Sequence, residues 1–520
     1  MGIDILTKVV LNIFEEIGND SRREITTNTK GNALVIKSGN ITRNYIFIVC
    51  YMLLTCSLGY GQKSTILKDV WPGKNSSEPN NFITIGKTLY FTARGLDGRE
   101  LWTTDGTSRG TAIVKNIGQG SGYGDSNPEF LTNVNGKLFF FANDGIHGNE
   151  LWVSDGSYSG TYMVKDIVAG ASKEGCNVQF VIVFREKLFF QIRKVTTTAS
   201  ETLHRSELWS SDGTEAGTQK IHEGLIATVS GGFSKLIGIA NERLFFYDHG
   251  VVYVTNEAGN KATIAFETNI STPFVTTSKF VFFYKRVAYV DDDGKELFAK
   301  ELWRTDGTPE GVIGLGCRSA SNAPVCFELI GDLVSNGERV FFNSREYNLH
   351  WTLTHGDELW SSDGTVAGTG IHNDLSPGTG GSHPRDILVA KNRIYVQTDD
   401  RKLWMTTSSP ATTTELLNME WIMDSPRIID LGNIQIIRYH RDGESIYLST
   451  DGTAKGTAFL GKNLVMDDQM VVHNNGTLYF IRGGGTQAIE IWQTRGSIES
   501  TKRLAIIEST RIPKTLFYHE

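Results

Sequence analysis

Six aspartates recur inside the same short turn, Ser/Thr-Asp-Gly-Thr/Ser, and a repeated carboxylate is a candidate ligand for a metal ion. They are Asp105, Asp155, Asp212, Asp306, Asp363 and Asp451. A calcium ion gathers about 6–8 oxygen ligands around one point, whereas these carboxylates stand one to a repeat, tens of residues apart. In a turn, aspartate instead accepts hydrogen bonds from backbone N–H groups, and the glycine supplies a positive φ. We therefore predict structural turns and no cofactor; calcium is an alternative that the spacing does not support.

One of these turns also spells the Gly-x-Ser-x-Gly motif of hydrolases, Gly106-Thr-Ser-Arg-Gly110. That motif presents a nucleophile only between a strand and a helix. Here it lies in a repeated hairpin whose sister copies carry Tyr158 and Glu215 at the serine position. The chain contains no His-Glu-x-x-His, no Walker loop and no Cys-x-x-Cys, the motifs of zincins, nucleotide hydrolases and zinc ribbons. We assign no catalytic residue and favour a protein without enzymatic activity.

Tryptophans precede five of these turns, in the motif Glu-Leu-Trp. They are Trp102, Trp152, Trp209, Trp303 and Trp360. A row of aromatic rings suits sugar binding, but a ring repeated in every unit is more typical of packing between units, where it buries about 150–250 Å². We predict the packing role.

The elements that carry these residues are copies of one unit. Copies of the motif begin 44 to 57 residues apart, at Glu100, Glu150, Glu207, Glu301 and Glu358, and in weaker form at Val251, Lys402, Ile446 and Glu490. This period is typical of propeller blades or helical repeats. Each unit has four short apolar segments separated by Asn-Gly and Asp-Gly turns, which are hairpin signals. We predict an all-β fold, a β-propeller of eight or nine four-stranded antiparallel blades.

An extra segment, Thr65–Gly73, has the pattern of a fourth strand and precedes the first unit. Paired with the last blade, it would close the propeller without a free edge. The ninth unit has its own candidate fourth strand at Lys502–Ile507, so the number of blades stays open between eight and nine.

The repeated unit Glu-Leu-Trp-x-x-Asp-Gly-Thr-x-x-Gly-Thr resembles the ELWxxDGT repeat of large secreted bacterial surface proteins. The resemblance covers roughly residues 64 to 507. The turn is also similar to the Asp-box hairpin of sialidase-like propellers, which is structural in those proteins. The resemblance implies export and a role at the cell surface, but no established activity.

The N-terminal segment indicates export as well. A basic flank at Arg43 precedes the apolar run 45–54, and small residues follow it, the composition of a secretory signal. This run is shorter than the roughly 20 residues of a membrane span. A cleaved signal is our prediction; a retained anchor and a buried strand are the alternatives. We divide the chain into an extension with signal, residues 1–62, and a repeat domain, residues 63–520, and predict a secreted or cell-surface protein.

The net charge of the chain bears on the partners that it can bind. The formal charge of −7 argues against nucleic acid, whose binders usually carry a basic surplus, and membrane attachment is expected only through an uncleaved anchor.

In an oxidising compartment Cys317 and Cys326 would close a short disulfide loop; two separate thiols are the alternative.

The links between segments differ most among the units. The link from the second to the third segment is long at residues 193–205, 285–298 and 344–355. These links and the Cys317–Cys326 stretch leave the same face, and loops on a rigid scaffold commonly carry binding sites. Their aromatic and polar residues are our ligand-binding candidates: Arg193, His204, Tyr347, His350, Trp351 and His355. We predict binding of an extracellular glycan or protein there. The alternatives are tolerated insertions in a structural module, and a polysaccharide hydrolase or lyase with a convergent carboxylate, Arg and Tyr or His.

Overall fold

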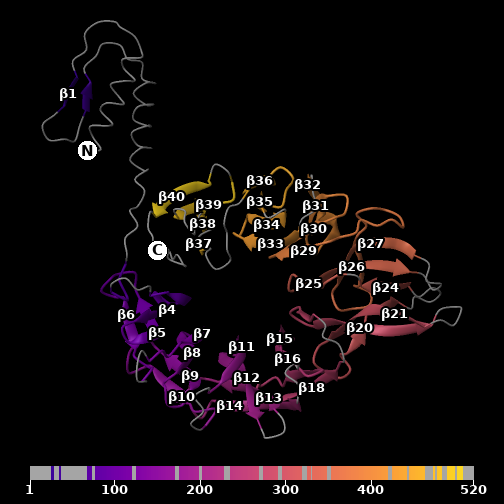
Figure 1. The fold of residues 1–520 in the computed structure, drawn as a ribbon. Coiled ribbons are helices and arrows are strands. Elements are labelled where there is room, and N and C mark those ends of the chain that lie inside the picture. The colour runs from indigo at the N-terminus through magenta and orange to yellow at the C-terminus, as the bar shows by residue number, and fades with distance from the viewer. Residues whose placement is uncertain are drawn as a thin grey trace. The chain divides into compact units, whose positions relative to one another are not determined.

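The computed structural model describes the backbone of most of the chain after residue 66 (Figure 1). The described ranges are 25–27, 34–36, 67–72, 77–119, 124–169, 175–197, 202–227, 235–268, 273–290, 296–318, 325–329, 331–347, 353–419, 424–441, 444–462, 472–474, 477–482, 489–497 and 500–507.

The chain divides into two compact units, Met1–Lys63 and Ser64–Glu520. In the first unit, β1 (Ile25–Thr27) pairs antiparallel with β2 (Leu34–Ile36). The predicted signal at 45–54 lies outside the described residues. Within the described part of the chain, no helix is long and apolar enough to span a membrane.

The described residues of the second unit form nine antiparallel sheets, eight with four strands and one with six. We call these sheets blades and number them in chain order. The first blade contains β3 (Asn80–Ile85), β4 (Thr88–Gly95), β5 (Gly98–Thr104) and β6 (Ala112–Lys115). The second contains β7 (Glu129–Val134), β8 (Lys137–Asn143), β9 (Asn149–Ser154) and β10 (Tyr162–Lys165). The third contains β11 (Asn177–Phe184), β12 (Lys187–Thr197), β13 (Thr202–Ser211) and β14 (Gln219–Ala227).

The middle blades include the six-stranded sheet. The fourth blade contains β15 (Lys235–Ala240), β16 (Arg243–Asp248), β17 (Val251–Thr255) and β18 (Ala262–Glu267). The fifth contains β19 (Val275–Thr276), β20 (Val281–Val290), β21 (Glu296–Thr305) and β22 (Ile313–Gly314). The sixth contains β23 (Cys317–Arg318), β24 (Val325–Leu329), β25 (Val334–Ser335), β26 (Val340–Tyr347), β27 (Leu353–Ser362) and β28 (Gly370–Asn373).

The last three blades again have four strands each. The seventh contains β29 (Ile387–Ala390), β30 (Arg393–Gln397), β31 (Lys402–Thr406) and β32 (Thr414–Asn418), with a 3-10 helix η1 (Pro410–Thr412) before its last strand. The eighth contains β33 (Asp424–Asp430), β34 (Gln435–Arg441), β35 (Glu444–Thr450) and β36 (Ala458–Lys462). The ninth contains β37 (Val472–Asn474), β38 (Thr477–Arg482), β39 (Ile489–Thr494) and β40 (Lys502–Ile507).

The predicted all-β propeller of four-stranded antiparallel blades is confirmed. Figure 1 shows the blades following one another in chain order, from the indigo β4 to the yellow β40. From the first blade to the eighth, the first strand of each blade contacts the first strand of the next. In the sixth blade, β25 takes the place of the first strand. Each of the nine repeats forms its own sheet within the described residues.

Apolar clusters fill the spaces between consecutive blades. Between the first and second blades, Leu101 and Ile117 pack with Phe140 and Trp152, all of them buried. The rings of Trp102, Trp209 and Trp360 are at most 9% exposed as well. These rings therefore belong to the core and do not form an exposed row. Burying a large apolar side chain stabilises the fold by about 1.5–3 kcal/mol.

The aspartate turns share one set of hydrogen bonds. Oδ1 of Asp105 accepts from the Thr107 N–H at 2.9 Å and from its hydroxyl at 2.7 Å, and the Thr107 hydroxyl accepts from the Gly110 N–H. These hydrogen bonds lower the pKa of Asp105. Gly110 is required because a Cβ there would lie 2.0 Å from the Asp105 carboxylate. The same bonds to the aspartate recur at Asp155, Asp212, Asp306, Asp363 and Asp451.

The segment before the first blade does not complete the last one. Its described part, residues 67–72, is not a strand, and the last sheet takes all four of its strands from β37 to β40. Lys68 Nζ instead donates to the Thr111 carbonyl, just as Lys115 Nζ donates to Thr161 in the next blade. Val70 packs against the cluster around Trp102. The segment thus contacts the first blade as a preceding fourth strand would.

Candidate functional site

The face opposite the aspartate turns differs most between blades. In the third, fifth and sixth blades the long links are not irregular loops, because the second and third strands continue to pair beyond the body of the sheet. The outermost rungs of these hairpins are Thr197–Thr202, Val290–Glu296 and Tyr347–Leu353. A ladder satisfies the backbone hydrogen-bonding groups of the insertion, so each insertion is an extended β-hairpin.

An inserted hairpin joins two of these extensions. β23 and β24 precede β25 in the link from the fifth blade to the sixth, and β24 pairs with β26 from Cys326–Tyr347 to Leu329–Ser344. β24 also contacts β21 of the fifth blade. The face at the fifth and sixth blades therefore gathers three extended elements, which we call the decorated face: the β20–β21 tip, the β23–β24 hairpin and the β26–β27 tip.

The predicted ligand-binding residues fall on two blades that are not neighbours. Arg193 lies on β12 opposite Ser206 on β13. The backbone of His204 lies on β13, with its side chain outside the described residues, and Trp351 and His350 lie outside them entirely. Tyr347 and His355 both lie on the sixth-blade hairpin.

Tyr347 belongs to a charged cluster on that hairpin. The Arg345 guanidinium binds the Asp357 carboxylate through Nε and, at 3.3 Å, through Nη2. The His383 Nδ1 lies 3.0 Å from the same carboxylate, and the Tyr347 side chain is hydrogen-bonded to Arg345. The sequence reasoning missed Arg345, Asp357 and His383, because they come from β26, β27 and the link to the seventh blade.

The neighbours of Asp357 keep its carboxylate ionised. Burial favours the protonated carboxyl of Asp357, but hydrogen bonds from Arg345 and His383 outweigh it and lower the pKa of Asp357. The hydrogen bond to Asp357 raises the pKa of Arg345. Asp357 is therefore a carboxylate near neutral pH, able to hold Arg345 and His383 in place but not to donate a proton.

Among the described residues, three blades carry a histidine–carboxylate pair where the second strand connects to the third, and two of these pairs are equally exposed. His355 pairs with Glu346 on the sixth blade, and its side chain is 37% exposed. His147 pairs with Asp144 at 2.7 Å in the short link of the second blade and is also 37% exposed. The hydrogen bond to Asp144 raises the pKa of His147. Because only the first pair lies on the decorated face, the second is a matched control for it.

A recurrent arginine is the signal that the sequence could have provided. In the second strand of four blades, a phenylalanine lies opposite the tryptophan of the Glu-Leu-Trp motif, and an arginine follows that phenylalanine three residues later. These arginines are Arg94, Arg193, Arg286 and Arg345. In the first blade the Arg94 guanidinium binds Asp125. Opposite Arg94 lies Arg99, which pairs with Glu78 at 3.1 Å. Arginines of the first and sixth blades thus have carboxylate partners.

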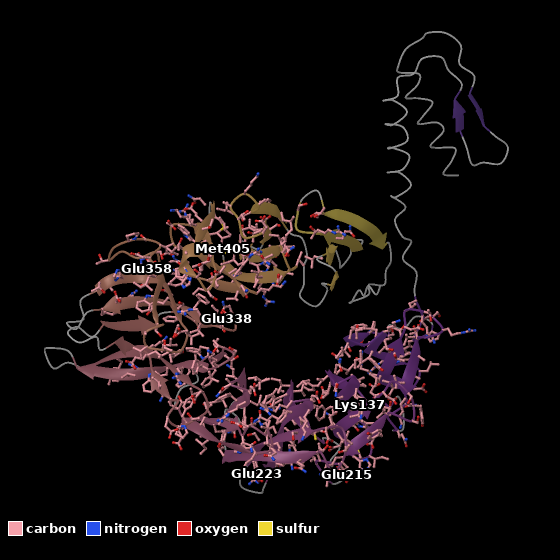
Figure 2. All side chains as sticks on the ribbon, turned by 180° about the vertical axis from the view of Figure 1, so that it is seen from behind. Lys137, Glu215, Glu223, Glu338, Glu358 and Met405 are labelled. Atoms are coloured by element: carbon pink, nitrogen blue, oxygen red, sulfur yellow. The ribbon has the colours of Figure 1, made fainter. Side chains whose placement is uncertain are left out.

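The Glu of the Glu-Leu-Trp motif also has a role that sequence reasoning did not assign. Glu358, labelled in Figure 2, is buried and accepts the Leu375 and Ser382 N–H groups at 2.9 and 2.7 Å. Glu100 and Glu150 accept equivalent bonds from the links that follow their own blades. Burial raises the pKa of all three carboxyls despite these bonds. This glutamate fastens the link between blades and is structural.

No group of three or more potential metal-ligating side chains occurs among the residues that the structure describes.

Comparison with known proteins finds no matching family and no matching curated protein. Solved structures with a similar fold include a prolyl endopeptidase, with 13% identity over 74% of this chain and 50% of that one, at a TM-score of 0.33. The chain thus spans half the length of that enzyme. Another is an oligogalacturonate lyase in complex with manganese, with 10% identity over 62% of this chain and 86% of that one, at 0.31. A third is the β-propeller domain of the Trilobed protease from Pyrococcus furiosus, with 10% identity over 84% and 100%, at 0.29. Identity at this level concerns the fold alone.

Proposed function

We propose that this protein is a secreted or cell-surface β-propeller that binds an extracellular glycan or protein, without catalysing a reaction, through the decorated face. The observation that carries the proposal is the pairing of β24 with β26 and its contact with β21. Three insertions that are separate in sequence thereby form one continuous surface on two blades. Insertions on a rigid scaffold are the usual carriers of binding sites.

The side chains of this surface suit recognition. Tyr347 presents a ring and a hydroxyl, and Arg345 is 40% exposed while Asp357 holds its guanidinium in place. An arginine fixed in this way loses little freedom on binding. The resemblance of the repeat to secreted bacterial surface proteins supports the extracellular part of the proposal, as does the predicted signal.

The test is a glycan-array and surface-protein screen of the full chain, followed by single substitutions. Tyr347→Ala and His355→Ala should each weaken the detected interaction, whereas His147→Ala, which removes an equally exposed pair from the second blade, should leave it unchanged. Thermal unfolding checks that each variant is folded. Equal binding by all of these variants would overturn the proposed surface.

A polysaccharide lyase is the second candidate, because Arg345 and His383 both bind the Asp357 carboxylate and Tyr347 is hydrogen-bonded to Arg345. An arginine can neutralise a uronate carboxylate, and a phenol or imidazole can move a proton. Incubation with acidic polysaccharides would then release unsaturated products, and His383→Ala would abolish their release while His147→Ala would not. We expect no product.

A further inference from the structure

The fifth-blade hairpin presents two cations side by side on one exposed surface. Arg286 and Lys300 are direct partners in the β20–β21 ladder, and Ala288 and Phe298 are partners on the next rung of the same surface. Residues directly opposite each other in a ladder share a face. Arg286 and Lys300 are exposed, and Phe298 is 49% exposed.

Aromatic rings hold both cations in place. The Arg286 guanidinium lies 4.3 Å from the centroid of the Phe298 ring, and Lys300 Nζ lies 5.1 Å from that of Tyr284. A ring attracts a cation through its quadrupole by about 0.5–1 kcal/mol at an exposed site. It orients the charge without neutralising it. We call Tyr284, Arg286, Phe298 and Lys300 the basic ribbon.

In the described part of the fifth-blade hairpin, the basic ribbon has no carboxylate partner, unlike the arginines at the equivalent positions of the first and sixth blades. Among the described residues, no carboxylate lies within ion-pairing distance of Arg286 or Lys300, whereas Arg94 has Asp125 and Arg345 has Asp357. Like charges directly opposite each other destabilise a sheet. A ligand that brings negative charge would remove this repulsion.

The opposite face of the same hairpin is anchored. Lys285 Nζ lies 4.2 Å from the Trp303 ring centroid and within 6 Å of those of Phe266 and Phe283. Phe283 is fully buried in the core between the fourth and fifth blades. The ladder therefore extends from a packed base, so the basic ribbon is preorganised rather than ordered on binding.

We propose that the basic ribbon binds an acidic polysaccharide, with Arg286 and Lys300 pairing with its carboxylate or sulfate groups and the exposed Phe298 ring covering a sugar face. This inference rests on the proposed function, because it names the ligand class of the decorated face. Two cations beside the exposed Phe298 ring suit a polymer with spaced charges. A chain of net charge −7 opposes a densely charged polyphosphate.

The test measures binding of polygalacturonate and of heparin, one carboxylated and one sulfated, to the full chain at low and high salt. The double variant Arg286→Ala/Lys300→Ala should lose about tenfold or more in affinity for the polymer that binds, and Phe298→Ala a smaller factor. The control is Lys137→Ala/Lys455→Ala. It makes the same charge change at exposed lysines on the opposite face (Lys137 is labelled in Figure 2) and should bind as the parent does. Binding by the parent should weaken with salt.

The outcomes separate this inference from the proposed function. If the ribbon double variant binds a polyanion as tightly as the parent, the basic ribbon is not the site. If neither polyanion binds but the glycan or protein found in the screen still requires Tyr347, the inference fails and the proposed function stands. If no ligand binds, both fail. Equal, ribbon-dependent binding of a DNA oligonucleotide would replace the acidic polysaccharide with nucleic acid.

Discussion

The first and fifth blades each place two cations on the equivalent rung of the ladder between their second and third strands, yet among the described residues only the first blade supplies carboxylate partners. Arg94 faces Arg99 in the first blade, and Arg286 faces Lys300 in the fifth. In the first blade Asp125 and Glu78 supply carboxylates. The same register position is therefore structural in one blade and available to a ligand in the other.

The connections that follow the two blades also differ. After the first blade, the short link to β7 carries Asp125, whose Oδ1 also accepts the Arg99 N–H at 2.8 Å. After the fifth blade, the corresponding link is occupied by the β23–β24 hairpin. The insertion that builds the decorated face thus lies in the link that corresponds to the one carrying Asp125 in the first blade.

The comparison of polyanion binding by the two blades requires a folded protein, so the pH range of stability matters. Among the changes considered, we expect protonation of His372 to have the largest effect on stability. Burial lowers the pKa of His372 to about 4, and its ring nitrogens lie 3.1 Å from the Ser361 hydroxyl and 3.2 Å from that of Thr406. The folded state keeps this imidazole neutral while the unfolded state takes up a proton near pH 6.5. The contribution of His372 to the free energy of unfolding is therefore fully present above pH 6.5. It falls by at most about 3 kcal/mol as the pH drops toward 4.

His372→Gln should flatten this part of the pH profile of thermal unfolding. The exposed His440, changed to Gln, is the control and should not alter it. Equal acid sensitivity in the parent and His372→Gln proteins would assign the loss to other groups.

The next test asks whether a disulfide links the two strands of the β23–β24 hairpin in addition to their backbone hydrogen bonds. Cys317 and Cys326 are direct partners in the register of β23 and β24, so we keep the prediction of a disulfide. A loop of this length would contribute about 2–3 kcal/mol. Reductant should lower the unfolding temperature of the parent but not that of Cys317→Ser/Cys326→Ser. Peptide mapping under non-reducing conditions should find the pair linked and the buried Cys176 free; alkylation of all three thiols would refute the disulfide.

Removing the counter-ion from the first blade should make it resemble the fifth. Asp125→Asn leaves Arg94 without its carboxylate and weakens the bond to the Arg99 N–H, so we expect a loss of about 2 kcal/mol in unfolding free energy. It should also create a second, weaker site for polyanions. Denaturant unfolding and polyanion binding measure both effects. Asp97→Asn, an exposed change in the nearby turn, should produce neither.

Adding a counter-ion to the fifth blade is the reverse experiment and should have the smallest effect on stability. Lys300→Glu places a carboxylate opposite Arg286, and an exposed cross-strand pair contributes about 0.5 kcal/mol. The unfolding temperature should rise slightly, while polyanion binding should disappear. Retained binding in this variant would mean that the two blades do not differ in the way proposed.

The repeat pattern was enough to predict the architecture, because hairpin turns and strand alternation are local properties. The Asp-Gly-Thr turns, the four strands of each unit and the buried position of Trp152 all depend on residues close in sequence or repeated in every blade. The sequence left alternatives open where the partner is distant. The segment at residues 67–72 has the composition of a fourth strand, yet its described residues contact the first blade instead of extending the last.

The candidate site illustrates the same division. By itself, the sequence determined that blades would form, that three of them would carry insertions, and that these would leave one face. Only the tertiary structure decided that the insertions are paired hairpins, that β24 joins β26, and that Asp357 gathers Arg345 and His383. It also decided which arginines are neutralised. Whether a charged side chain forms an internal ion pair or can bind a ligand depends on the groups within a few ångströms of it. Those groups come from other strands and links, so the local sequence does not encode them.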